Sequence, residues 1–305
     1  MGRQLRGMTM LMTAAFIWGT AFVAQRFGMA HVGPLTFIAV RFAVGGVSLL
    51  PVIWVNSLFA CGEPDASSGG RRARRSEPLR GGLVCGVVLL VSTIFQQVGI
   101  MYTTVGKSGF ITTLYIVIVP ILGLFLGRRS KWLTWCCVAV AVAGMYLLCV
   151  NESLSLNKGD AYTLGCAFFF AFHILVIDHY SSTVDGVKLS SIQFFTCSAI
   201  AFAAAFAFER PELSSITSAW ASILYAGVLS SGVGYTFQIL GQRDVNPVAA
   251  SLIMSLESVF AVLTGWMMLN ETLTEREIFG CVLIFAANML IQISGVEKNA
   301  SGHSV

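Results

Sequence analysis

The stretch SLIMSLESVFAVLTGWMML, residues 251–269, has the length and apolar character of a membrane-spanning helix, yet it carries a glutamate, Glu257, near its middle. A helix needs roughly 20 apolar residues to cross a bilayer. A carboxylate at the bilayer centre costs about 2.5–3.5 kcal/mol on insertion scales, and such groups usually face the interior of a bundle or a water-filled cavity. Glu257 is therefore expected to face away from lipid, sheltered by further helices of the same chain.

The rest of the chain has the composition of a membrane protein. Of its 305 residues, 56% are hydrophobic and 11% are charged, and the mean hydropathy is +0.77. Soluble domains carry about 25% charged residues, so most of this surface is expected to face lipid. The eight cysteines show no CxxC pair and no Cys/His spacing typical of a metal site. No metal and no cofactor is predicted.

Ten apolar segments are long enough to span a membrane. The predicted spans are 8–27, 34–59, 79–101, 105–126, 132–150, 159–179, 188–208, 217–241, 246–269 and 276–294. The first resembles the apolar part of a signal peptide, but it lacks a clear cleavage site and is interpreted as a retained helix. The longest connection, 60–78, is a polar loop rich in glycine, serine and arginine.

The distribution of lysine and arginine predicts the orientation. With the N-terminus inside, thirteen of these residues fall in inside segments and four in outside segments. The positive-inside rule then places both termini in the cytoplasm. The RRARR cluster at 71–75 is interpreted as part of this signal, although nucleic acid and lipid headgroups are the other partners of such clusters. We expect a multi-pass protein of the plasma (cell inner) membrane that binds no nucleic acid.

The chain also repeats itself. TIFQQVG (93–99) and YTFQILG (235–241) align at a spacing of 142 residues, which pairs Gln96 with Gln238. At a spacing of 152, AAFIWG (14–19) aligns with CAFFFA (166–171). The predicted domains are a first five-helix repeat, 8–150, a second five-helix repeat, 159–295, and a short cytoplasmic tail, 296–305.

Because each repeat has an odd number of helices, the two repeats should cross the membrane in opposite directions. Inverted repeats are the architecture of many secondary transporters, whose substrate site lies near the bilayer midplane at the repeat interface. The expected fold class is an all-α polytopic membrane protein with ten transmembrane helices in two inverted halves.

Two regions resemble a known family. FIWGTAFVAQR with AVRFAVGG, and SLESVFAVLTGWMMLNETLTEREIFGCVLIFAANMLI, resemble the two EamA-type domains of the drug/metabolite transporter superfamily, over about 8–295. The resemblance implies ten helices in a five-plus-five inverted arrangement and export of amino acids, other metabolites or drugs. The sequence departs from the family pattern at Ser258, where proline is usual, at Tyr115, which stands opposite Glu257, and at GRRSK (127–131).

Polar and aromatic residues recur at helical spacing inside several spans. Each alone is explained by packing between helices, but together they favour a shared central cavity for an amphipathic small molecule. The candidate substrate-binding residues are Trp18, Phe22, Gln25, Gln96, Ser108, Thr112, Tyr115, His173, Tyr235, Gln238 and Glu257.

Two charged residues lie deep in the spans. Glu257 is expected either to exchange a proton against substrate or to hydrogen-bond a neighbouring helix and hold the bundle together. Arg41 has three readings: a side chain that snorkels to the interface, a charge partner of Glu257, or a group that attracts an anionic substrate.

The leading hypothesis is a non-enzymatic secondary exporter, monomer or homodimer, with protons as a candidate coupling ion. GKS at 106–108 imitates a nucleotide-binding loop but lacks the required upstream glycine, because position 101 is Met101. The alternatives are an intramembrane serine hydrolase that uses Ser108, with His173 as base, and a non-transporting membrane scaffold.

Overall fold

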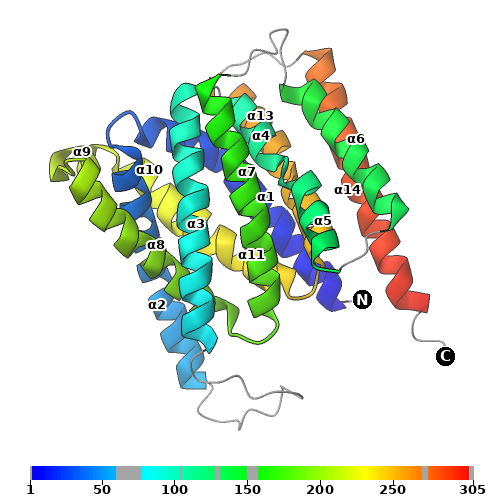
Figure 1. Cartoon of the computed structure of the whole chain (residues 1–305), viewed down its shortest axis with the longest axis horizontal. Helices are drawn as coiled ribbons and strands as arrows, with labels where there is room; N and C mark the ends of the chain where they lie inside the picture. The colour runs from blue at the N-terminus through cyan, green and yellow to red at the C-terminus, as the bar shows by residue number, and fades with distance from the viewer. Residues whose placement is uncertain are drawn as a thin grey trace.

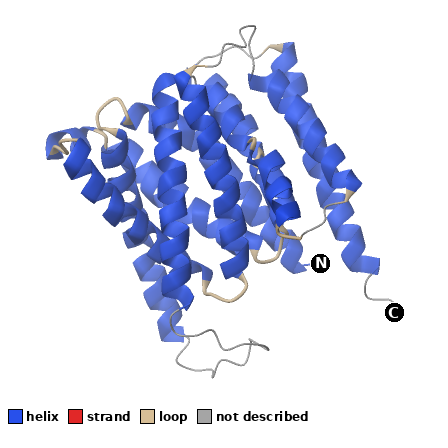
Figure 2. Ribbon diagram, viewed as in Figure 1, coloured by secondary structure: helices blue, strands red, loops and turns tan. Residues whose placement is uncertain are grey.

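Nearly all of the described chain is helical, as expected for segments that must satisfy their backbone groups without water. The computed structural model describes residues 2–59, 77–103, 105–127, 131–149, 157–269 and 274–301, and no strand occurs in these ranges (Figures 1 and 2). The helices are α1 (Gly2–Gly28), α2 (Pro34–Phe59), α3 (Glu77–Tyr102), α4 (Val105–Thr113), α5 (Tyr115–Phe125), α6 (Trp132–Cys149), α7 (Lys158–Ser181), α8 (Gly186–Phe208), α9 (Leu213–Ser218), α10 (Trp220–Leu224), the π-helix η2 (Tyr225–Tyr235), α11 (Thr236–Gln242), α12 (Pro247–Met254), α13 (Leu256–Leu269) and α14 (Glu275–Ser301).

Eight helical segments in the described ranges are long and apolar enough to cross a membrane, and two shorter apolar segments accompany them, Trp132–Leu147 and Ile278–Leu290. These correspond to the ten predicted spans, and the expected all-α polytopic fold is confirmed. The first and last helices are longer than predicted: α1 begins at Gly2 and α14 continues to Ser301. The basic cluster at 71–75 and most of GRRSK lie outside the described residues.

The helix directions follow from contacts between helices. Arg26, near the end of α1, donates a hydrogen bond to the carbonyl oxygen of Thr103, so α1 and α3 end together. Gly99 of α3 packs against Thr163 of α7, and Gly81 packs against Tyr180, so α3 and α7 are antiparallel. Hence α1 and α7, which begin the two halves, run in opposite directions. The start of α1 and the end of α14 lie at the same end of the bundle (Figure 1).

Two spans are interrupted within one residue of repeat-related positions. The fourth breaks at Leu114, between α4 and α5, and the ninth breaks at Ser255, between α12 and α13. The hydroxyl of Thr113 donates to the carbonyl oxygen of Phe110, and that of Ser255 donates to the carbonyl oxygen of Leu252. Such local bonds compete with helical backbone bonds and bend helices. The interruptions leave Tyr115 and Glu257 in the first turns of α5 and α13.

Side-chain carboxylates tie helices together at the end of the bundle opposite the termini. Glu209, after α8, accepts hydrogen bonds from the backbone N–H groups of Leu35 and Thr36 at 2.8 Å and from the Thr36 hydroxyl at 2.6 Å. A carboxylate at a helix N-terminus satisfies free N–H groups and complements the helix dipole. In the same region, Asp160 of α7 accepts a hydrogen bond of 2.8 Å from Thr103, which follows α3.

Candidate functional site

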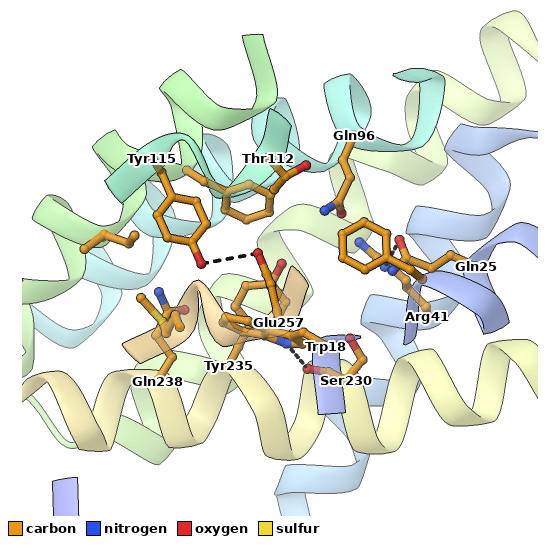
Figure 3. A pocket seen from close by; sticks show the side chains of 14 residues that line it. Trp18, Gln25, Arg41, Gln96, Thr112, Tyr115, Ser230, Tyr235, Gln238 and Glu257 are labelled. Atoms are coloured by element: carbon orange, nitrogen blue, oxygen red, sulfur yellow. Dashed lines mark hydrogen bonds between the residues drawn. The ribbon is translucent and has the colours of Figure 1, made fainter. Parts of the chain in front are cut away.

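A cavity lies at the centre of the bundle, where helices from both halves meet (Figure 3). We call it the central cavity. Its cavity volume is about 30 Å³. The lining residues are Trp18, Phe22, Gln25, Arg41, Gln96, Thr112, Tyr115, Phe170, Ile174, Ser230, Tyr235, Gln238, Met254 and Glu257.

The lining of the central cavity is largely symmetric. Ten of the fourteen residues form five pairs at the two repeat spacings. The pairs are Trp18 with Phe170 and Phe22 with Ile174, at 152 residues, and Gln96 with Gln238, Thr112 with Met254 and Tyr115 with Glu257, at 142 residues. Equivalent positions in two inverted repeats meet only around the axis that relates the repeats. The central cavity therefore lies on that axis, where inverted-repeat transporters hold their substrates.

Glu257 is 4% exposed and faces the central cavity from the first turn of α13. Its Oε1 accepts a hydrogen bond of 3.2 Å from the hydroxyl of Tyr115 (Figure 3). Helix α1 packs closely behind it, since a Cβ on Gly19 would lie 2.7 Å from the carbonyl oxygen of Glu257 and 2.5 Å from the Cβ of Phe260. The close approach of the two helices fixes where the carboxylate stands.

Arg41 is 1% exposed, which excludes a side chain that snorkels to the interface. Its Nη1 donates a hydrogen bond of 3.2 Å to Oε1 of Gln25, and its guanidinium lies 4.7 Å from the ring centre of Phe42. Its Nε and Nη2 have no hydrogen-bond partner among the described residues. No ion pair joins Arg41 to Glu257 in the described part of the chain, so the two side chains line one cavity without pairing with each other.

Aromatic groups form another part of the wall. The Trp18 ring lies 4.8 Å from the Tyr235 ring, centre to centre, and its Nε1 donates a hydrogen bond of 3.1 Å to the carbonyl oxygen of Ser230. Ser230 and Tyr235 belong to η2, and π-helical turns occur frequently at functional sites. A Cβ on Gly234 would lie 2.6 Å from Nε1 of Trp18, so this approach requires glycine.

Of the eleven predicted substrate-binding residues, nine line the central cavity, together with Arg41. Ser108 and His173 do not. Ser108 is fully buried and its hydroxyl has no partner in the described structure, so no histidine is bonded to it as a serine hydrolase would require. His173 Nε2 instead lies 3.2 Å from Oε1 of Gln193 on α8.

Four lining residues were not predicted: Phe170, Ile174, Ser230 and Met254. Phe169, one turn before His173 on α7, stacks on Phe95, with ring centres 5.5 Å apart. The 152-residue spacing carried the missing signal, because it places Phe170 over Trp18 and Ile174 over Phe22. The described residues contain no group of three or more histidine, cysteine, aspartate or glutamate side chains that could hold a metal ion.

Two inverted halves around a polar central cavity define a polytopic membrane protein with the architecture of secondary transporters. Comparison with known families identifies the family. The chain belongs to the EamA-like transporter family, which matches residues 5–150 and 157–293.

Similar proteins are named as transporters. The chain is 27% identical over 293 residues to an uncharacterized transporter of Archaeoglobus fulgidus, covering 93% of this chain and 84% of that protein. It is 24% identical over 288 residues to the uncharacterized inner membrane transporter YedA of Escherichia coli K12, covering 91% and 87%. It is 26% identical to the solute carrier family 35 member B1 homolog of Drosophila melanogaster, covering 68% and 65%. A solved crystal structure, 14% identical, shares the fold with a TM-score of 0.76 over 94% of this chain and 96% of that one.

Proposed function

We propose that the protein is a secondary carrier that exports a small amphipathic metabolite or drug through the central cavity by alternating access. The observation that carries the proposal is the set of five repeat-related residue pairs around one cavity. If the halves exchange conformations, a site on their axis keeps the same residues around it and opens first to one side and then to the other.

The interrupted helices supply the moving parts. Each half contributes one span that breaks in mid-membrane, at Leu114 or at Ser255, next to a cavity residue. A helix that is already interrupted can bend there without losing further backbone hydrogen bonds. In this mechanism, closure at the end opposite the termini includes the Glu209 bonds to the start of α2.

Glu257 is proposed to couple transport to protons. It is a buried carboxylate on the cavity wall whose one hydrogen bond in the described structure comes from Tyr115. An acidic group that the cavity exposes to each side in turn can carry a proton one way as the solute moves the other way. Following the distribution of lysine and arginine, we place both termini in the cytoplasm and the protein in the plasma (cell inner) membrane.

Counterflow in liposomes tests the proposal. The purified full-length chain is reconstituted, loaded with one unlabelled compound at a time from a panel of amino acids, nucleobases and cationic drugs, and assayed for uptake of the same labelled compound. Saturable uptake that depends on internal compound is expected for at least one panel member. A folded protein that gives no counterflow with any of them would contradict carrier function. The Met254→Trp variant, which fills the central cavity, should abolish the signal, whereas Val52→Trp, at an exposed position of α2, should not.

A further inference from the structure

We infer that the transported solute is a zwitterion whose carboxylate binds the free edge of Arg41 and whose ammonium group binds beside Glu257. This inference rests on the proposed carrier function and specifies the class of solute. It rests on two sets of groups on the cavity wall: unpaired hydrogen-bond donors on Arg41, and an unpaired acceptor on Gln238 beside Glu257.

The free edge of Arg41 has the geometry of a carboxylate site. Nε and Nη2 lie on the same side of the planar guanidinium, and both lack a hydrogen-bond partner in the described structure. Two parallel N–H groups on one edge are the fork that binds a carboxylate through two hydrogen bonds. The third nitrogen, Nη1, is held by Gln25, which fixes the plane of the group. A guanidinium that is 1% exposed and has two unpaired nitrogens is costly unless an occupant pairs with it.

The equivalent position in the other half carries no charge. Arg41 corresponds to Gln193 at the 152-residue spacing. Gln193 is fully buried, does not line the central cavity, and uses its Oε1 in the contact with His173. One half therefore fills the position with a neutral side chain bonded to a neighbouring helix, while the other places a cation with a free edge at the cavity. This difference between equivalent positions points to a role for Arg41 in recognition.

The other side of the site offers hydrogen-bond acceptors. Glu257 uses Oε1 for the Tyr115 bond, and Oε1 of Gln238 has no partner among the described residues. Both side chains lie on the cavity wall, away from the pair formed by Arg41 and Gln25 (Figure 3). An ammonium group has three donors and no acceptor, and it matches a carboxylate beside an amide oxygen. The rings of Trp18 and Tyr235 provide apolar surface for the body of the solute.

A phosphate ester also fits an arginine fork. However, it carries more negative charge than a carboxylate, and it would share this cavity with Glu257 without a second cation among the lining residues. The observations therefore favour the carboxylate, and a phosphate ester is included in the test.

The test uses matched probes in the same counterflow assay. L-phenylalanine carries both groups, phenethylamine only the ammonium, 3-phenylpropionate only the carboxylate, and phenyl phosphate the alternative anion. L-leucine, isoamylamine and 4-methylvalerate repeat the comparison on a branched body. We expect saturable counterflow of at least one zwitterion and at least tenfold weaker competition by its single-charge analogues. Competition by phenyl phosphate as strong as that by the zwitterion would overturn the carboxylate assignment.

Variants separate recognition from folding. Arg41→Gln should raise the KM for the zwitterion at least tenfold, the order expected when one partner of a buried charge pair is removed. Arg41→Lys keeps the charge without the fork and should give an intermediate value. Arg80→Gln removes an exposed charge at the start of α3 and should change nothing. If Arg41→Gln does not fold, Arg41→Lys and the analogue series on the wild type test whether Arg41 binds the solute carboxylate.

The two proposals fail differently. If the wild type carries only neutral or purely cationic members of the panel, or if the Arg41 variants keep the wild-type KM for the zwitterion, the inference is wrong and the carrier stands. Absence of counterflow for every compound contradicts the carrier itself.

Discussion

Tyr115 and Glu257 occupy the same position in the two halves, 142 residues apart, and their side chains are hydrogen-bonded to each other across the centre of the bundle. Residues that meet their own repeat counterparts lie on the axis between the halves. Two glutamates there would pair poorly, because two carboxylates repel and each lacks a donor. The two halves have instead diverged to a donor and an acceptor, which satisfies the contact and leaves one acid in the cavity.

Glu257→Gln should uncouple transport from protons without abolishing it. The amide still accepts the Tyr115 hydrogen bond, but it cannot bind and release a proton in the relevant pH range. Uptake driven by a pH gradient should be lost, whereas counterflow at equal pH should persist with a raised KM, because the amide keeps an acceptor oxygen for the solute but loses the negative charge. Full gradient-driven uptake by this variant, measured in proteoliposomes, would rule out Glu257 as the coupling group.

Tyr115→Phe should lower the free energy of unfolding slightly, because it removes only the hydrogen bond to Glu257. Hydrogen bonds between membrane helices contribute about 0.6 kcal/mol on average and up to about 1.7 kcal/mol. A double-mutant cycle with Glu257→Ala, which removes the acceptor, should give a coupling energy in this range when unfolding is measured in detergent. Additive effects of the two substitutions would mean that the bond does not contribute to stability.

Gly19→Ala should destabilise the protein by about 1–3 kcal/mol, the usual cost of overpacking. The added methyl group would lie 2.5 Å from the Cβ of Phe260 and 2.7 Å from the carbonyl oxygen of Glu257, so α1 and α13 would have to separate. Gly109→Ala is the matched control, because the nearest atom to its added methyl group is 4.0 Å away. Equal melting temperatures for the two variants would contradict the close packing of α1 on α13.

Glu209→Gln should loosen the start of α2. The carboxylate serves three donors with its two oxygens, and an amide can accept through only one of its two terminal atoms. Amide hydrogen exchange at Leu35 and Thr36 should accelerate at least tenfold, the equivalent of about 1.4 kcal/mol. Glu212→Gln is the control, since Glu212 is exposed and its side chain makes no capping bond to α9. Unchanged exchange at these two amides in Glu209→Gln would show that the Glu209 hydrogen bonds do not stabilise the first turn of α2.

The fold was largely predictable, because the length of the apolar segments and the FQxxG pair report membrane spans and repeat spacing directly. The interruptions at Leu114 and Ser255 were not. A serine or threonine inside an apolar helix bonds its own backbone, a neighbouring helix or solvent, and the sequence does not say which. The π-helical conformation of η2, where Trp18 packs against Gly234, was not predicted either.

For the site, helical spacing found the cavity-facing sides of most spans but failed on α7. His173 drew attention as the polar residue of that helix, yet it lies one residue away from the face defined by Phe170 and Ile174, which points into the cavity. Arg41 was identified as unusual, but which neighbour it contacts depends on how α1 and α2 pack, and composition does not reveal this.

In the proposed mechanism, one cavity on the axis between two inverted halves opens to each side of the membrane in turn. Thr112, on the cavity wall, provides the direct test. In a variant whose eight native cysteines are replaced by alanine, Thr112→Cys is exposed to a membrane-impermeant maleimide from one side of sealed vesicles and then from the other. Alternating access predicts labelling from both sides, slowed by a transported solute. Labelling from one side only, with or without solute, would contradict it.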